Sequence, residues 1–275
     1  TGASNTAVGL NALNLSTTAS NNTAVGMHAL YANTTGTENV AVGMASLDNC
    51  DVGSENTAIG KSALGNDTKG SRSTAVGNSA LQTQNFTSAT NAYNSAFGFN
   101  AGGAVTTGLR NTLIGAKAGD TITTGGDNVA VGANALTANT TASSNTAVGS
   151  SALLANTTGT RNTAVGANAL DASTTANYNS AFGTHAGSSI TTGSLNSVFG
   201  DYALAATTTG DGNSAFGQAS LGQNTTGHSN TAVGKVSLYS NTQGLRNTGL
   251  GFNAGGGITN GDDNTMIGIY AGNHA

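Results

Sequence analysis

A 17-residue repeat constrains this chain more than any other feature of its 275 residues. The phrase Asn-Thr-Ala-Val-Gly, or a close variant, starts sixteen times, and fourteen of the fifteen intervals between starts are 17 residues long. The remaining interval, from Ser73 to Asn94, is 21 residues long. A strict period of this length is typical of solenoids, in which each repeat forms one coil stacked on the next. The copies start at Asn5, Asn22, Asn39, Asn56, Ser73, Asn94, Asn111, Asn128, Asn145, Asn162, Asn179, Asn196, Asn213, Asn230, Asn247 and Asn264.

Within each copy, numbered from its first residue, positions 2 to 4 favour a short β-strand. Position 2 is Thr, Ser or Val, position 3 is mostly Ala, and position 4 is always Val, Ile, Leu or Phe. Position 5 is Gly in every copy, which predicts a positive φ or a backbone approach too close for a Cβ. Gly or Ala at position 15 predicts a second corner. The apolar spacing lacks a 3.6-residue period, so we expect an all-β, parallel β-solenoid (β-roll) of about sixteen 17-residue coils.

Positions 9 and 12 show a compensation in side-chain volume. Position 9 is Leu in eleven copies and Gly in four complete copies, and each Gly copy carries Val or Ile at position 12. We therefore predict that positions 9 and 12 share one interior space in each coil. The compensated pairs are Gly102 with Val105, Gly119 with Ile122, Gly187 with Ile190, and Gly255 with Ile258.

The strand also predicts which residues face the interior. On a β-strand, positions 2 and 4 share one face and position 3 lies on the other. We expect residues such as Val25 to point inward and residues such as Ala24 to point outward. A row of outward alanines would suit contact with a neighbouring chain, and an exposed alanine face without a partner is the alternative.

The repeat phrases resemble those of known surface fibres. Asn-Ser-Val-Phe-Gly at 196–200 and Asn-Thr-Ala-Val-Gly elsewhere resemble the head repeats of YadA-like trimeric autotransporter adhesins. The longer pattern NTAVG-x-x-AL-x-x-NTTG is similar to the arrays of phage tail-fibre-like proteins, and the resemblance covers essentially the whole chain. It implies a left-handed β-roll, three parallel chains side by side, and an extracellular location on a cell surface or a virion tail. The coil here is longer than the adhesin head repeat.

The two ends of the sequence fall inside a copy. We therefore expect residues 1–275 to be a single repeat array taken from a longer one, with a four-residue insertion within 82–93.

Composition and charge argue against several classes of protein. Charged residues make up 7% of the chain, the net charge is −4, and the eight Lys and Arg are scattered, so we expect no nucleic-acid partner. No apolar run is long enough to span a bilayer, so we expect no direct membrane insertion in this segment. Cys50 is alone and no local catalytic motif stands out, so we expect neither an enzyme nor a cofactor.

Metal-binding residues are present but scattered. His28, His185, His228 and His274 lie far apart in the array, so we predict no metal site from them. Carboxylates at the corners leave calcium binding open as an alternative, although solvated turn carboxylates are the simpler interpretation. These corner carboxylates are Asp127, Asp262 and Asp263.

The 21-residue copy holds our candidate ligand-binding residues. Loops that project from a rigid scaffold often carry recognition, and this stretch has two aromatic residues in a chain with few. We predict that Phe86 and Tyr93 stack on a sugar or a host protein, with Asn85 and Asn91 beside them. The alternative is a tolerated insertion that covers a core defect.

Together these observations predict a non-enzymatic structural or adhesive fibre segment that associates with itself. A homotrimer is the first expectation, with a host glycan or protein as an attachment partner. A single-chain subunit of a head-to-tail filament is the main alternative. Thr-Thr pairs such as Thr34–Thr35 and Thr157–Thr158 leave an ice-binding surface as a further alternative.

Overall fold

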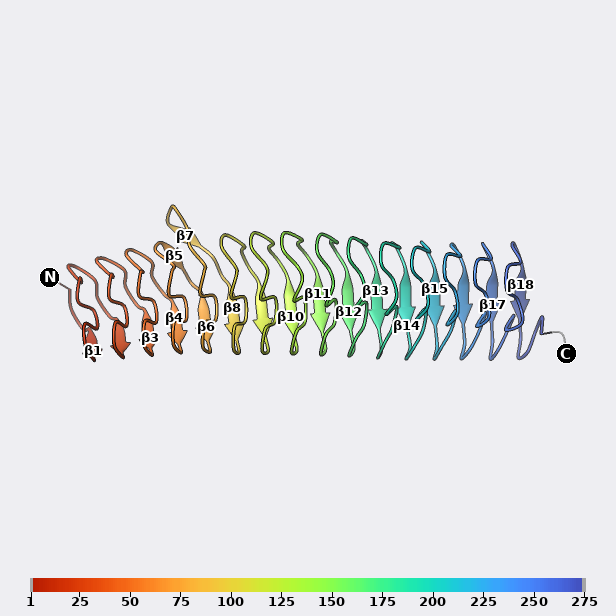
Figure 1. The fold of residues 1–275 in the computed structure, drawn as a ribbon, viewed down its shortest axis with the longest axis horizontal. Coiled ribbons are helices and arrows are strands. Elements are labelled where there is room, and N and C mark those ends of the chain that lie inside the picture. Colours follow the sequence, from red (N-terminus) through yellow and green to blue (C-terminus); the bar gives the residue numbers. More distant parts are fainter. Residues whose placement is uncertain (1, 274–275) are drawn as a thin grey trace. The chain divides into compact units, whose positions relative to one another are not determined.

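The computed structural model describes residues 2–273, which form short β-strands and turns without a helix. The fold is an all-β parallel β-solenoid with coils of about 17 residues, which confirms the predicted class. The chain divides into two compact units, Thr1–Ala142 and Ser143–Ala275, each a stack of coils (Figure 1). His274 lies outside the described residues.

The first unit contains one parallel sheet with one strand from each coil, and a separate pair of two-residue strands, β5 (Gly70–Ser71) and β7 (Thr90–Asn91). The sheet strands, in spatial order, are β1 (Thr6–Val8), β2 (Thr23–Val25), β3 (Val40–Val42), β4 (Thr57–Ile59), β6 (Thr74–Val76), β8 (Ser95–Phe97), β9 (Thr112–Ile114) and β10 (Val129–Val131).

The second unit repeats this arrangement with its strands in chain order. They are β11 (Thr146–Val148), β12 (Thr163–Val165), β13 (Ser180–Phe182), β14 (Ser197–Phe199), β15 (Ser214–Phe216), β16 (Thr231–Val233), β17 (Thr248–Leu250) and β18 (Thr265–Ile267).

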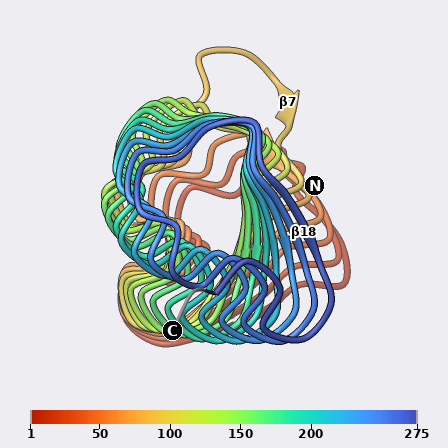
Figure 2. The same cartoon turned by 90° about the vertical axis from the view of Figure 1, so that its right-hand side faces the viewer.

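Strand pairing keeps equivalent positions of successive coils opposite each other. Thr6 pairs with Thr23, one 17-residue period later. Across the longer copy, Thr74 still pairs with Ser95. The additional residues leave the stack instead, in a loop that projects from the coils beside β7 (Figures 1 and 2).

The glycine at position 5 satisfies both of the reasons predicted for it. Gly200 has a φ of 142°, in a region that L side chains rarely adopt. A Cβ built on Gly200 would lie 2.5 Å from the carbonyl oxygen of Gly217, the equivalent glycine of the next coil. The corner therefore depends on glycine both for its dihedral angles and for the distance between coils.

Leucine at position 9 has a backbone conformation that its residue type did not predict. Leu30 and Leu47 have φ values of 50° and 47°, and both side chains are fully buried. Positive φ is unfavourable for a side chain of this size, so burial and neighbouring hydrogen bonds must hold it. Leu30 N–H donates to the carbonyl of Ser46 in the next coil at 3.0 Å, and this contact anchors the turn.

The expected facing of positions 3 and 4 is wrong. Ala24 is fully buried, as are most residues at position 3, whereas Val25 is half-buried and Ile59, also at position 4, is 40% exposed. Leucine at position 9 and asparagine at position 1 already fill the interior of each narrow coil, which leaves room for little more than a methyl group on the inner face of the strand. The larger position-4 side chain therefore lies outside.

The predicted compensation between positions 9 and 12 is confirmed. A Cβ on Gly119 would lie 2.7 Å from Cδ1 of Ile122, and one on Gly187 would lie 2.9 Å from Cδ1 of Ile190. Both isoleucines are fully buried. The same interior space is thus filled by leucine from position 9 or by an aliphatic side chain from position 12.

Asparagine at position 1 forms a buried ladder along each unit. Asn39 Nδ2 donates to the carbonyl of Gly53 in its own coil at 2.8 Å, and Asn39 Oδ1 accepts from the backbone N–H of Asn56 in the next coil at 2.9 Å. Each amide therefore closes its own coil and binds the following one. This accounts for a polar residue at a position that is almost fully buried.

Candidate functional surfaces

The largest exposed apolar feature is the set of position-4 side chains, which we call the position-4 row. In the second unit Phe182, Phe199 and Phe216 stand on adjacent strands with 36%, 37% and 38% of their surface exposed. Their rings stack with centroids 4.7 and 4.9 Å apart. The first unit carries the same row, with Val8, Ile59, Phe97 and Ile114 all exposed. Extended apolar surface of this kind is typical of interaction sites.

The loop of the longer copy differs from our expectation at one of its two aromatic residues. Phe86 is only 5% exposed, so its ring is not available to stack on a ligand as we predicted, because the loop folds over it. Tyr93 is 49% exposed, but Arg72 lies 5.8 Å from its ring centroid and Arg72 Nη1 donates to its hydroxyl at 2.8 Å. Asn85 and Asn91 are exposed. Ligand binding by Asn85, Asn91 and Tyr93 stays a prediction.

The same copy contains a repair of the asparagine ladder. Ser73 stands where other copies have asparagine, and the buried amide of Gln84 takes over the missing role. Gln84 Nε2 donates to Ser73 Oγ at 3.1 Å, and Gln84 Oε1 accepts from Asn94 Nδ2 at 2.8 Å. This agrees with the alternative that the irregular copy compensates for a defect in the core.

Gln84 also reaches Asp67, which is a buried carboxylate. Gln84 Nε2 lies 2.6 Å from Asp67 Oδ2, and Gly70 N–H donates to Asp67 Oδ1 at 2.9 Å. Burial raises the pKa of Asp67 above its ordinary value, and these hydrogen bonds offset part of that rise.

We predict that Asp67→Asn reduces the pH dependence of stability. Because the pKa of Asp67 is higher in the folded state than in the unfolded state, its stabilising contribution is complete below the unfolded pKa. That contribution is lost as the pH rises through the folded pKa. Urea unfolding at a series of pH values from about 3 to 7 should show a smaller decline in unfolding free energy for the variant than for the parent.

Asp127→Asn serves as the control with the opposite sign. Hydrogen bonds from Arg110 lower the pKa of Asp127, so its contribution is present above the unfolded pKa and is lost as the pH falls through the folded pKa. Its effect should be small because both side chains are about half exposed. An Asp67→Asn curve parallel to that of the parent would contradict the assignment.

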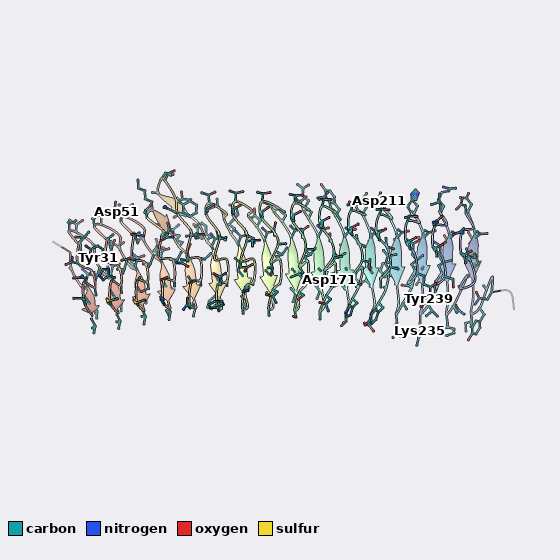
Figure 3. All side chains as sticks on the ribbon, viewed as in Figure 1. Tyr31, Asp51, Asp171, Asp211, Lys235 and Tyr239 are labelled. Atoms are coloured by element: carbon teal, nitrogen blue, oxygen red, sulfur yellow. The ribbon has the colours of Figure 1, made fainter. Side chains whose placement is uncertain are left out.

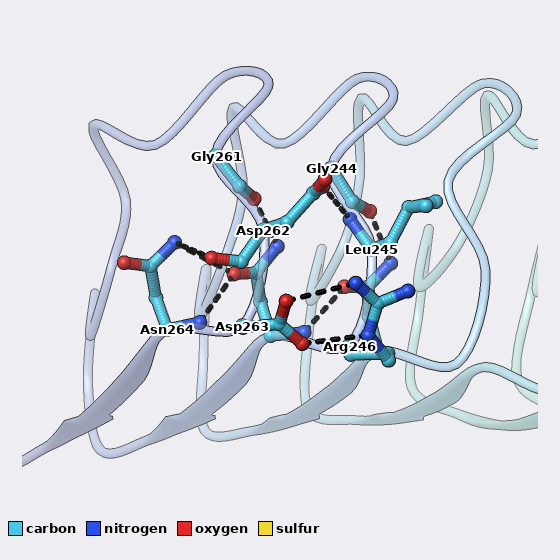
Figure 4. A network of polar contacts seen from close by, with 9 residues as sticks. Gly244, Leu245, Arg246, Gly261, Asp262, Asp263 and Asn264 are labelled. Carbon is cyan, nitrogen blue, oxygen red and sulfur yellow. Dashed lines mark hydrogen bonds and ion pairs between the residues drawn. The ribbon is translucent and has the colours of Figure 1, made fainter.

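The corner carboxylates considered for calcium are held by other groups. Figure 4 shows Arg246 forming two hydrogen bonds with Asp263, at 2.6 and 2.8 Å, while Asp262 accepts from the backbone N–H of Leu245 at 2.8 Å. Asp127 is paired with Arg110 in the same way. Among residues 2–273, no three His, Cys, Asp or Glu side chains form a group that could hold a metal ion.

The described histidines lie in separate surroundings. The ring of His28 stacks on Tyr31 with centroids 4.9 Å apart, and the ring of His185 stacks on Tyr202 at 4.7 Å. The two stacks lie in different units and do not form a common site.

Threonines at position 13 use their hydroxyl groups within the solenoid. Thr174 Oγ1 donates to the carbonyl of Thr191 at 3.2 Å, and Thr191 Oγ1 donates to that of Thr208 at 3.1 Å. The neighbouring position-14 threonines, such as Thr192 and Thr209, are exposed. The Thr-Thr pairs therefore provide one hydroxyl for contacts between coils and one for solvent, which supports a structural role for the pair.

A pocket of about 280 Å³ lies in the second unit and was missed by sequence reasoning. It is lined by Tyr202, Ala205, Gln218, Ala219, Gly222 and Tyr239, which come from three successive coils. The available signal was two tyrosines at positions 7 and 10, separated by a coil with alanine and glycine at those same positions. In Figure 3, Tyr239 and Lys235 lie toward the lower edge of the coils, opposite Asp211 at the upper edge.

Comparison with known proteins adds no family assignment. No protein-family model matches the chain, and no curated protein matches it. Residues 2–273 contain no helix with the length and apolar character needed to cross a bilayer. Functional argument therefore starts from the surfaces described above.

Proposed function

We propose that this chain is a non-enzymatic structural and adhesive fibre segment that associates side by side with identical chains. The observation that carries the proposal is the position-4 row, which places an exposed apolar side chain on every strand of each unit. Soluble monomers rarely leave so extended an apolar surface in water. A second copy offers a row with the same coil spacing, so the match can repeat from coil to coil.

The chemistry of the row favours association through apolar packing. Position 4 is Val, Ile, Leu or Phe in all sixteen copies, without a charged or polar substitute. The phenylalanine stack of the second unit provides its broadest part. Association would remove these rings from water and so provide its main driving force.

The resemblance to trimeric adhesin heads and tail-fibre arrays gives the proposal its biological setting. In that setting the assembly is a parallel homotrimer outside the cell, on a bacterial surface or a phage tail. The exposed side chains away from the position-4 row would then be available for attachment to a host glycan or protein. A single-chain subunit of a head-to-tail filament remains the alternative that the next experiment separates.

We expect light scattering of the purified chain to give three times the mass of one chain. Phe199→Glu should weaken association by at least about tenfold, because a charge would be buried against apolar side chains of the partner. The control is Thr209→Glu, which introduces the same charge at an exposed position of the same unit. Its mass should equal that of the parent.

Two results would overturn the proposal. The mass of a single chain at all concentrations tested would mean that the row has no partner of its own kind. A mass that increases without limit with concentration, and that Phe199→Glu leaves unchanged, would support the head-to-tail filament.

A further inference from the structure

The pocket of the second unit lies at the end of a stack of planar side chains. His185 and Tyr202 occupy position 7 in successive coils, and their rings are parallel within 6°. The next position-7 residue is Ala219, which has only a methyl group. One face of Tyr202 is therefore covered by His185, and the other looks along the stack into the space above Ala219.

Small residues keep that space open. Ala205 and Gly222 occupy position 10 in two adjacent coils and line the pocket. Tyr239 occupies position 10 in the following coil, and its ring lies over Gly222, where a Cβ would come within 2.8 Å of Tyr239 Cε2. The result is a hollow one coil wide, bounded by two tyrosines that are 49% and 36% exposed.

The polar groups of the pocket are neutral. Gln218 contributes an amide, and each tyrosine contributes a hydroxyl group. Asp201 and Lys235 hold the position equivalent to Gln218 in the two flanking coils, so the charges nearest in register are of opposite sign. This arrangement offers hydrogen bonds without a net charge, which disfavours a strongly charged ligand.

We propose that this pocket binds a single neutral sugar ring, the terminal pyranose of a glycan. The negative face of an aromatic ring attracts the weakly positive C–H groups of a pyranose, and Tyr202 presents one free face. Gln218 and the tyrosine hydroxyls can pair with sugar hydroxyls. A volume of about 280 Å³ lies at the lower limit of ligand pockets, which fits one ring better than an extended chain.

The inference rests on the proposed attachment role, and it assigns that role a place and a ligand class. It does not depend on the number of chains in the assembly. Binding and mass are therefore measured on the same samples, so that each proposal can fail separately.

The probes are methyl glycosides of glucose, galactose, mannose, fucose and N-acetylglucosamine, studied by saturation-transfer NMR and titration. We expect at least one to bind the full chain with a dissociation constant of about 1 mM, as is usual for small ligands with few contacts. Tyr202→Ala and Tyr239→Ala should each weaken binding by about tenfold, and Gln218→Ala by several-fold. Other copies carry alanine at each of these positions, so the variants should fold.

The sharpest variant is Ala219→Tyr, which extends the planar stack and fills the hollow. Tyr202 and Tyr270 show that position 7 accepts tyrosine with the required positive φ. Binding should be abolished while the mass and circular dichroism spectrum stay unchanged. Ser151→Tyr makes the same kind of change at position 7 of another coil in this unit, and it should bind sugar as the parent does.

Three outcomes would overturn the inference. The parent could bind none of the five glycosides, or Ala219→Tyr could bind them as well as the parent does. A tyrosine-containing peptide could also bind where sugars do not, which would make the pocket a peptide site. A threefold mass with any of these results would leave the fibre proposal standing, and sugar binding by a single chain would leave only the present inference standing.

Discussion

Replacing Gly200 with alanine is expected to destabilise the second unit by about 3–5 kcal/mol, which would be among the largest effects of adding one methyl group. The new Cβ would lie 2.5 Å from the carbonyl oxygen of Gly217, which belongs to backbone and cannot rotate away. The φ of 142° adds strain for any L residue. Urea unfolding and amide hydrogen exchange in the neighbouring coils would measure the loss.

Gly212→Ala is the matched control in the same unit. Gly212 also has a positive φ, of 64°, but this value lies in the left-handed helical region, and the nearest atom to an added Cβ is 4.0 Å away. We expect a cost of no more than about 1 kcal/mol. Equal effects of the two substitutions would show that φ alone, and not the contact between coils, makes glycine necessary at position 5.

Removal of one amide from the asparagine ladder should have a comparable effect in the first unit. Asn39→Ala leaves the carbonyl of Gly53 and the backbone N–H of Asn56 without their buried partners. Each unsatisfied group costs about 1–3 kcal/mol, and the lost volume adds to this, so we expect about 3–5 kcal/mol in total. Chemical denaturation of the variant and its parent would give the difference.

Asn78→Ala makes the identical substitution on the surface of the same unit. Asn78 is exposed at position 6, where other copies carry alanine, so we expect a change within about 0.5 kcal/mol. A loss for Asn39→Ala as small as that for Asn78→Ala would mean that water replaces the amide, and that the ladder contributes little to stability.

The repeat could be translated into a fold because its strictest positions report backbone constraints. Glycine at position 5 predicted a corner or a close approach, and Gly200 shows both. The exchange of volume between positions 9 and 12 predicted a shared interior space, which Gly119 and Ile122 confirm. These inferences needed only one coil and its variants.

The facing of the strand could not be derived in the same way. Alternation shows that Ala24 and Val25 lie on opposite faces, but it does not show which face is inside a coil with strands of three residues. A useful signal was present in the range of sizes at position 4, from Val165 to Phe182, without compensation elsewhere in the coil. Freedom of volume of this kind is typical of a side chain outside a packed interior.

Two further features required three-dimensional coordinates. Positive φ at leucines such as Leu30 contradicts the ordinary preference of the residue, and only the packing of the coil explains it. The pocket beside Tyr202 depends on residues from adjacent coils, so it becomes visible only when equivalent positions are aligned in space. By contrast, the loop favoured from the sequence directs Phe86 into its own fold.

The in-register pairing of equivalent positions makes the length of such a solenoid change in whole steps. Duplicating or deleting one complete 17-residue copy would reproduce every contact between neighbours, because each strand pairs with the strand of the next coil at the same position. A change of any other size must leave the stack, as the 21-residue copy does while Thr74 and Ser95 stay paired. The gene can therefore extend or shorten the protein by recombination between its own repeats without redesigning the cross-section.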